Sequence, residues 1–229
     1  MSLGKFRSLS FIALAVLALA DTALTQDQSS GLLNSVEVQQ LVTRAEPADH
    51  ARLSTHFRAL GDRYAAEAKR HSSMSQSYVG NPNRNIGQGM AVHCKRLSDL
   101  NTQSSNTARE LATYHQQLAG GTPATPPPGS GRFDAGAGAP APTDKELNAL
   151  AAKASTPREH RVLQEYFQAL EKRYASDATQ HVAFAQAYRG TRIAQAAVHH
   201  DRLAERAREA AKEAGEAAAM HSALASTTR

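Results

Sequence analysis

Two stretches of the chain share one pattern of apolar and polar positions that repeats every seven residues. The seam positions of the two stretches hold His50, Phe57, Tyr64, His71 and Tyr78, and His160, Phe167, Tyr174, His181 and Tyr188. The companion positions, three residues further on, hold mostly leucine, methionine and phenylalanine. Two such positions per heptad are typical of helices that pair in a left-handed coiled coil. The pattern predicts two helices of about 32 residues that end at Gly80 and Gly190.

The two stretches belong to two copies of one longer repeat. Residues of the first long helix match residues 110 positions later, as His50 matches His160. Beyond the glycine the separation falls to 106, as in His93 and His199, because the first copy has a longer loop around residues 81–85. A match of this length with one change of offset indicates an internal duplication.

Each copy is expected to begin with a short helix and to continue as a hairpin of two long helices. Thr143-Asp-Lys-Glu146 is a capping box, and Asn34-Ser-Val-Glu37 has the related spacing. Thr156-Pro157 marks the start of a long helix in the second copy, and Glu46-Pro47 is a weaker version of the same signal.

The second long helices are expected near residues 88–119 and 192–225, where apolar residues again share one stripe. In the second copy this stripe is mostly alanine, which allows close approach of helices. The predicted fold class is all-α: two tandem long antiparallel helical hairpins that pack as a four-helix bundle with coiled-coil-like seams, or that remain two hairpins on a linker.

The segments outside the hairpins have other compositions. Residues 1–20 combine Lys5 and Arg7 with an apolar run and an Ala-Leu-Ala motif, which predicts a signal peptide cleaved after residue 20 or as late as 25. The alternative is an uncleaved anchor. Residues 21–33 and 226–229 are expected to be disordered. Residues 120–142 hold six of the nine prolines and predict a linker between the repeats at 34–119 and 143–225.

Composition narrows the functional classes. The formal charge of +5 falls by two, to +3, without Lys5 and Arg7, and both signs are interspersed, which argues against nucleic-acid binding. Cys94 is the only cysteine, so the chain has no internal disulfide. No nucleophile, cofactor loop or acid–base pair stands out. We therefore expect a non-catalytic protein, secreted or periplasmic, with no membrane span after cleavage.

Histidines recur at four equivalent positions in each copy. On each predicted long helix two of them lie 21 or 22 residues apart, or about 32 Å. Folding each hairpin about its turn brings these histidines to two shared levels. The expected pairs are His71 with His93, His50 with His115, His181 with His199, and His160 with His221. If the hairpins pack together, each level could hold up to four imidazoles.

Neutral imidazoles gathered inside a helical bundle are ligands for Zn²⁺ or Cu²⁺. Glu67 and Asp177 lie four residues before His71 and His181, so each could orient the ring or bind the ion itself. Further ligands could come from the residues beside the other two histidines, Cys94 and His200. His56 has a tyrosine at the equivalent position and is expected on the surface.

The alternative interpretation is structural. Polar residues in a helix seam can fix register, and imidazoles paired with carboxylates or tyrosines need no metal and can respond to pH. Our leading hypothesis is a bundle that binds Zn or Cu through the eight repeated histidines. The alternative is a coiled-coil structural, protein-interaction or envelope-stress protein. The expected partners are a metal ion, or a protein or second copy that packs on the helices.

The order His-x-x-Leu, then Tyr, His and Tyr at heptad spacing, then Ala-Val-His-Cys or Ala-Val-His-His, resembles secreted bacterial helical-hairpin repeat proteins with recurring histidines. The resemblance covers residues 34–119 and 143–225. It implies a bacterial source. That group has no assigned activity, so the functional hypotheses rest on the histidines.

Overall fold

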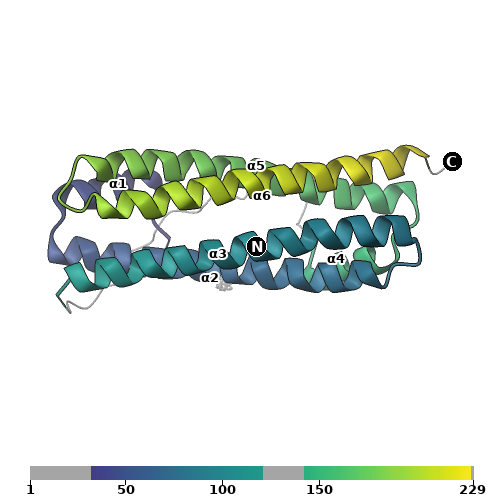
Figure 1. Cartoon of the computed structure of the whole chain (residues 1–229), viewed down its shortest axis with the longest axis horizontal. Coiled ribbons are helices and arrows are strands. Elements are labelled where there is room, and N and C mark those ends of the chain that lie inside the picture. Colours follow the sequence, from purple (N-terminus) through teal and green to yellow (C-terminus); the bar gives the residue numbers. More distant parts are fainter. Residues whose placement is uncertain (1–31, 121–141, 228–229) are drawn as a thin grey trace, which may run out of the picture.

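The computed structural model describes residues 32–120 and 142–227, which form helices and no strand (Figure 1). The helices are α1 (Ser35–Arg44), α2 (Pro47–Val79), α3 (Arg84–Leu118), α4 (Asp144–Lys153), α5 (Pro157–Arg189) and α6 (Gln195–Thr227). The predicted all-α fold is confirmed. The predicted signal peptide, most of segment 21–33 and nearly all of the predicted linker lie outside the described residues.

The predicted capping residues begin the helices. Asn34 and Thr143 each accept the backbone N–H three residues on, while Glu37 and Glu146 accept the N–H of the cap residue in return. Thr156 starts α5 in the same way. Two boundaries differ from the expectation. Residues 226–227 belong to α6, and residues 32–33 are buried in the core, so neither pair is disordered.

The long helices pair as two antiparallel hairpins, α2 with α3 and α5 with α6. In the first hairpin, serine hydroxyls donate across the interface to backbone carbonyls of the partner helix. The bonds run from Ser54 to Ala112, Ser105 to Gly61, Ser98 to Ala68 and Ser75 to Ala91. The two residue numbers of each bond add up to 166. The hairpin therefore keeps one register along its whole length.

The two hairpins lie antiparallel to each other, so that the turn of each meets the open end of the other (Figure 1). Tyr78 beside the first turn bonds His221 near the end of α6, and Tyr188 beside the second turn bonds His115 near the end of α3. These equivalent contacts relate the two copies by an approximate two-fold axis.

The two sides of the bundle are built differently. α3 and α6 pack directly on each other, and the buried face of α6 is rich in alanine, as at Ala207, Ala210 and Ala214. On the other side, α2 and α5 are joined by long side chains. The short helices cover that side reciprocally, since α1 packs on α5 as well as α2, and α4 packs mainly on α2.

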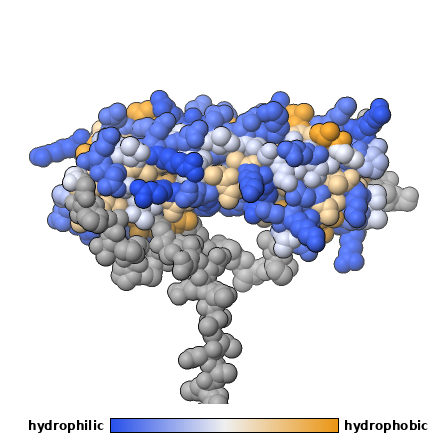
Figure 2. All heavy atoms as spheres, turned by 90° about the horizontal axis from the view of Figure 1, so that it is seen from below, coloured by the Kyte–Doolittle hydropathy of each residue, from blue (hydrophilic) through white to orange (hydrophobic). Residues whose placement is uncertain are grey.

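Among the described residues, the large apolar side chains exposed on the surface are Val36, Val79, Val92 and Val198. The face in Figure 2 is largely hydrophilic with small separate apolar patches. Among the described residues, no helix combines the length and hydropathy needed to cross a membrane. The apolar side chains are used instead for packing between the helices, as in the buried rows of Leu, Phe and Tyr on α2 and α5.

Candidate functional site

Histidine is concentrated inside the bundle. Eight of the ten histidines are buried, namely His50, His56, His71, His115, His160, His181, His200 and His221. The other two, His93 and His199, are half-buried on α3 and α6, each facing the opposite helix. Most of the histidines therefore lie in the core, among side chains that are otherwise mainly apolar.

Two equivalent hydrogen-bonded chains connect the copies. The Nδ1 atoms of His50 and His115 lie 3.1 Å apart, and Nε2 of His115 lies 2.9 Å from the Tyr188 hydroxyl. The counterpart chain consists of His160, His221 and Tyr78. The Nδ1 atoms of its two histidines lie 3.2 Å apart, and Nε2 of His221 lies 2.9 Å from the Tyr78 hydroxyl. The predicted pairs His50–His115 and His160–His221 are thus confirmed.

A third chain corrects the other predicted pairs. Nδ1 of His181 lies 3.3 Å from Nδ1 of His200, and its Nε2 lies 3.1 Å from the Tyr64 hydroxyl. His199 instead turns toward α3, where its Nδ1 lies 3.4 Å from Glu110. The predicted pairing of His181 with His199 is therefore wrong by one residue. The predicted pairing of His71 with His93 is wrong in the same way, because His93 also turns toward the opposite hairpin, where it meets Glu213. One residue is about 100° around a helix, enough to exchange inside for outside.

The predicted carboxylates bind arginines rather than histidines. Arg63 donates to Asp177 at 2.9 Å, and Arg173 donates to Glu67 at 2.9 Å, which forms two equivalent ion pairs between the hairpins. Glu67 comes within 3.9 Å of the His71 Nε2, too far for a hydrogen bond. Both carboxylates therefore join the hairpins and do not fix a histidine tautomer.

Burial keeps these imidazoles neutral. Desolvation lowers the pKa of His115, His181 and His221 to about 3 each. Positive charge nearby adds to this effect at His181, which faces Arg63. Desolvation likewise lowers the pKa of His71 to about 4, although Glu67 acts in the opposite direction. Neutral imidazoles are the form that binds a metal, and also the form that shares one proton along a chain of hydrogen bonds.

His56 is buried, whereas its mismatch with Tyr166 between the repeats predicts a position on the surface. Its Nδ1 accepts the backbone N–H of Leu33 at 2.9 Å and so holds the segment that leads into α1. The second copy has Tyr166 at the position of His56, and Pro142, which has no N–H, precedes the cap residue of α4. His56 is thus a packing and capping group of one copy only.

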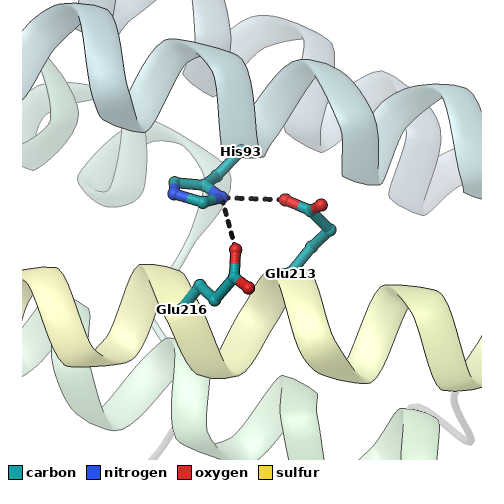
Figure 3. A group of neighbouring side chains, drawn as sticks. All are labelled: His93, Glu213 and Glu216. Atoms are coloured by element: carbon teal, nitrogen blue, oxygen red, sulfur yellow. Dashed lines mark hydrogen bonds and ion pairs between the residues drawn. The ribbon is translucent and has the colours of Figure 1, made fainter.

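The predicted sites of four histidines do not form. Within residues 32–120 and 142–227, one group of three His, Cys, Asp or Glu side chains places its ligand atoms within 4.8 Å of one another, and it consists of His93, Glu213 and Glu216. Figure 3 shows that both glutamates reach from α6 toward the imidazole on α3. Nδ1 of His93 lies 2.8 Å from Glu213 Oε2 and 3.8 Å from Glu216 Oε2.

This group is accessible but partly shielded. The side chains of His93 and Glu213 are 14% and 12% exposed, and that of Glu216 is 45% exposed. Arg96 donates to Oε1 of Glu213 at 3.0 Å, which leaves Oε2 directed at the imidazole. Lys212 lies 3.9 Å from the second glutamate. One imidazole and two carboxylates form a possible metal-binding group with three protein ligands.

The symmetry-related contact between α6 and α3 has an incomplete version of the same group. His199 corresponds to His93, and Glu110 corresponds to Glu216. At the position of Glu213, however, the first copy has Thr107, whose hydroxyl accepts a hydrogen bond from Arg206. Of the two equivalent contacts between α3 and α6, one therefore has two carboxylates beside its histidine and the other has one.

The sequence contained partial signals for these residues. Glu213 and Glu216 lie three residues apart, on one helix face, but their proximity to His93 depends on how α6 packs against α3. Comparisons with protein families, with curated proteins and with solved structures found no match to this chain. A function must therefore be argued from the geometry of the chain itself.

Proposed function

We propose that the protein is a secreted or periplasmic, non-catalytic helical bundle that binds a divalent transition metal ion, Zn²⁺ or Cu²⁺, at His93, Glu213 and Glu216. The observation that carries the proposal is the convergence of three ligand atoms from α3 and α6 within 4.8 Å of one another. Because these helices belong to different copies, a bound ion would fasten the two hairpins together.

The separations suit a small ion. Two ligands of a tetrahedral Zn²⁺ ion, each at about 2.0–2.2 Å, lie roughly 3.4 Å apart. The distances from His93 to the two glutamates, 2.8 and 3.8 Å, bracket this value, so small side-chain rotations would complete the coordination. The two carboxylates also balance the charge of a divalent ion, and solvent access at Glu216 provides a path of entry.

Isothermal calorimetry with Zn²⁺ and Cu²⁺ tests this proposal on the protein without its leader. We expect one ion per chain with a Kd below about 10 μM, and binding at least about 10-fold weaker in Glu213→Gln. Glu110→Gln is the matched control, because it changes the equivalent interface that has only one carboxylate, and it should bind like wild type. Wild-type binding weaker than about 10 μM, or equal binding by Glu213→Gln, contradicts the proposal.

A structural or protein-interaction role is the second candidate, and the hydrogen-bonded chains favour it. The chain of His50, His115 and Tyr188 is complete without a metal ion, and so is its counterpart in the other copy. This candidate predicts that Zn²⁺ leaves the melting temperature of the wild type unchanged. The metal-binding proposal predicts a rise that depends on ion concentration and disappears in Glu213→Gln.

The location outside the cytoplasm rests on residues 1–20 alone. Fractionation of cells that express the full chain, followed by N-terminal sequencing of the mature protein, tests it. We expect the mature chain to begin between residues 21 and 26. An intact leader in the cytoplasmic fraction would remove the secretion part of the proposal and leave the metal site to be judged by calorimetry.

A further inference from the structure

Register places Cys94 opposite His71 in the core of the first hairpin. The facing pair His50–His115 has residue numbers that add up to 165, and so do His71 and Cys94. In the second copy the corresponding residues are two histidines whose Nδ1 atoms lie 3.3 Å apart. Four core levels thus carry a facing pair, and only this one contains a thiol.

Two methionines lie about one helical turn closer to the hairpin turn. Met74 follows His71 by three residues on α2, and Met90 precedes Cys94 by four residues on α3, so each pair shares one helix face. All four side chains are fully buried, at 0% exposure. Both methionines and the cysteine belong to one continuous core cluster. Three sulfur-containing side chains and one imidazole are therefore buried within about one turn of one another along the first hairpin.

His71 has no hydrogen-bond partner at this level. Both of its ring nitrogens are buried without one. The corresponding histidine of the second copy, His181, is hydrogen-bonded to Tyr64. Tyr174 occupies the position equivalent to Tyr64, but it accepts a hydrogen bond from Asn101 at 2.8 Å. An imidazole at 0% exposure with two unpartnered nitrogens is costly unless a ligand uses one of them.

The second copy lacks this set of donors. The residues that correspond to Met74, Met90 and Cys94 are Phe184, Ala196 and His200. Each sulfur of one hairpin is thus replaced by an aromatic, small or imidazole side chain in the other. Packing alone does not require three sulfur-containing residues here, because the same helical seam is filled without them.

We propose that His71, Met74, Met90 and Cys94 form a buried site for a soft monovalent metal ion, Cu(I) or Ag(I). Thiolate and thioether ligands select Cu(I), whereas the half-buried His93 group offers two carboxylates with hard oxygen ligands. Binding forms a metal–sulfur bond to Cys94 and releases its thiol proton to solvent, with no change in oxidation state.

This site is independent of the proposed divalent site, because it uses other residues and another class of ion. The test is competition for Cu(I), under anaerobic conditions, between the reduced wild-type protein and the chelator bicinchoninate. X-ray absorption then identifies the atoms bound to the ion. We expect one Cu(I) per chain with sulfur and nitrogen neighbours, and one proton released on binding.

Cys94→His is the informative variant, because it gives the first hairpin the facing pair that the second hairpin already contains. Circular dichroism should show that it folds, and its Cu(I) affinity should fall by at least about 100-fold, while Met90→Leu weakens binding by about 10-fold. Met220→Leu, which alters a methionine on α6, serves as the control and should bind like wild type. Equal affinity in Cys94→His, absence of sulfur neighbours, or no Cu(I) binding by the wild type would overturn the proposal. Glu213→Gln should leave Cu(I) binding intact, which separates the two sites.

Discussion

The burial of neutral histidines predicts that mild acid destabilises the bundle. In the unfolded chain the pKa of histidine is about 6.5. In the folded protein burial lowers the pKa of His56, His115, His181 and His221 to about 3 and that of His71 to about 4. The unfolded chain therefore binds more protons between these values. Stability is complete above pH 6.5 and falls as the pH drops toward the folded-state pKa.

The size of the effect follows from linkage. Below pH 6.5, each buried neutral histidine lowers the free energy of unfolding by about 1.4 kcal/mol per pH unit. The five histidines with these values, together with His200, whose pKa burial lowers well below its usual range, give a slope of about 8 kcal/mol per pH unit. Domains of ordinary stability unfold at about 5–15 kcal/mol, so the bundle should lose its fold between about pH 5.5 and 4.5. Carboxylates with lowered pKa values, such as Glu67, add to the loss only at more acidic pH.

Urea unfolding followed by circular dichroism at several pH values from 7.5 to 5.0 measures this slope. His200→Cys is the matched variant, since it copies the residue found at the equivalent position, Cys94, and removes one titrating group. Its slope should be smaller by about 1.4 kcal/mol per pH unit. The reasoning fails if the wild type loses less than about 2 kcal/mol between pH 7 and pH 5, or if both proteins have the same slope.

Two further predictions concern packing and charge. Gly87→Ala places a Cβ atom 2.6 Å from the Tyr78 carbonyl oxygen and should lower the free energy of unfolding by about 1–3 kcal/mol. Gly190→Ala, with open space around the new Cβ atom, should change it by less than about 1 kcal/mol. Urea unfolding at pH 7.5 compares the two variants. Asp177→Asn removes the charge that faces the partly buried Arg63 and should cost about 1–3 kcal/mol, so a loss below about 0.5 kcal/mol in thermal unfolding would show that the ion pair contributes little.

Local signals in the sequence predicted the fold well, and tertiary features escaped them. Capping boxes, prolines and heptads act within one helix or hairpin, so they gave the helix starts and the pairing of α2 with α3 and of α5 with α6. The antiparallel arrangement of the hairpins could not be derived, because a heptad seam accepts a partner in either direction. The crossing of α1 onto α5 depends on that same arrangement.

The histidine pairs nearer the hairpin turns were predicted wrongly. Matching histidines by level gave residue numbers that add up to 165 for His50 and His115 but 164 for His71 and His93. Requiring one constant sum would have chosen Cys94 and turned His93 outward, toward α6. The glutamates that meet His93 come from the other copy, and no pattern within a single repeat could indicate that contact. Periodicity thus located the core levels but not the residues that face each other across the bundle.

The reciprocal packing of α1 and α4 has a consequence for how the two copies can change. Each copy covers its partner with its own short helix, which is how two identical subunits exchange arms in a symmetric dimer. In such a dimer every substitution appears twice, and each core level must tolerate it on both sides. On one fused polypeptide a substitution appears once. One half of this molecule can therefore hold a thiol where the other keeps an imidazole, and can take on a new ligand while its twin preserves the packing.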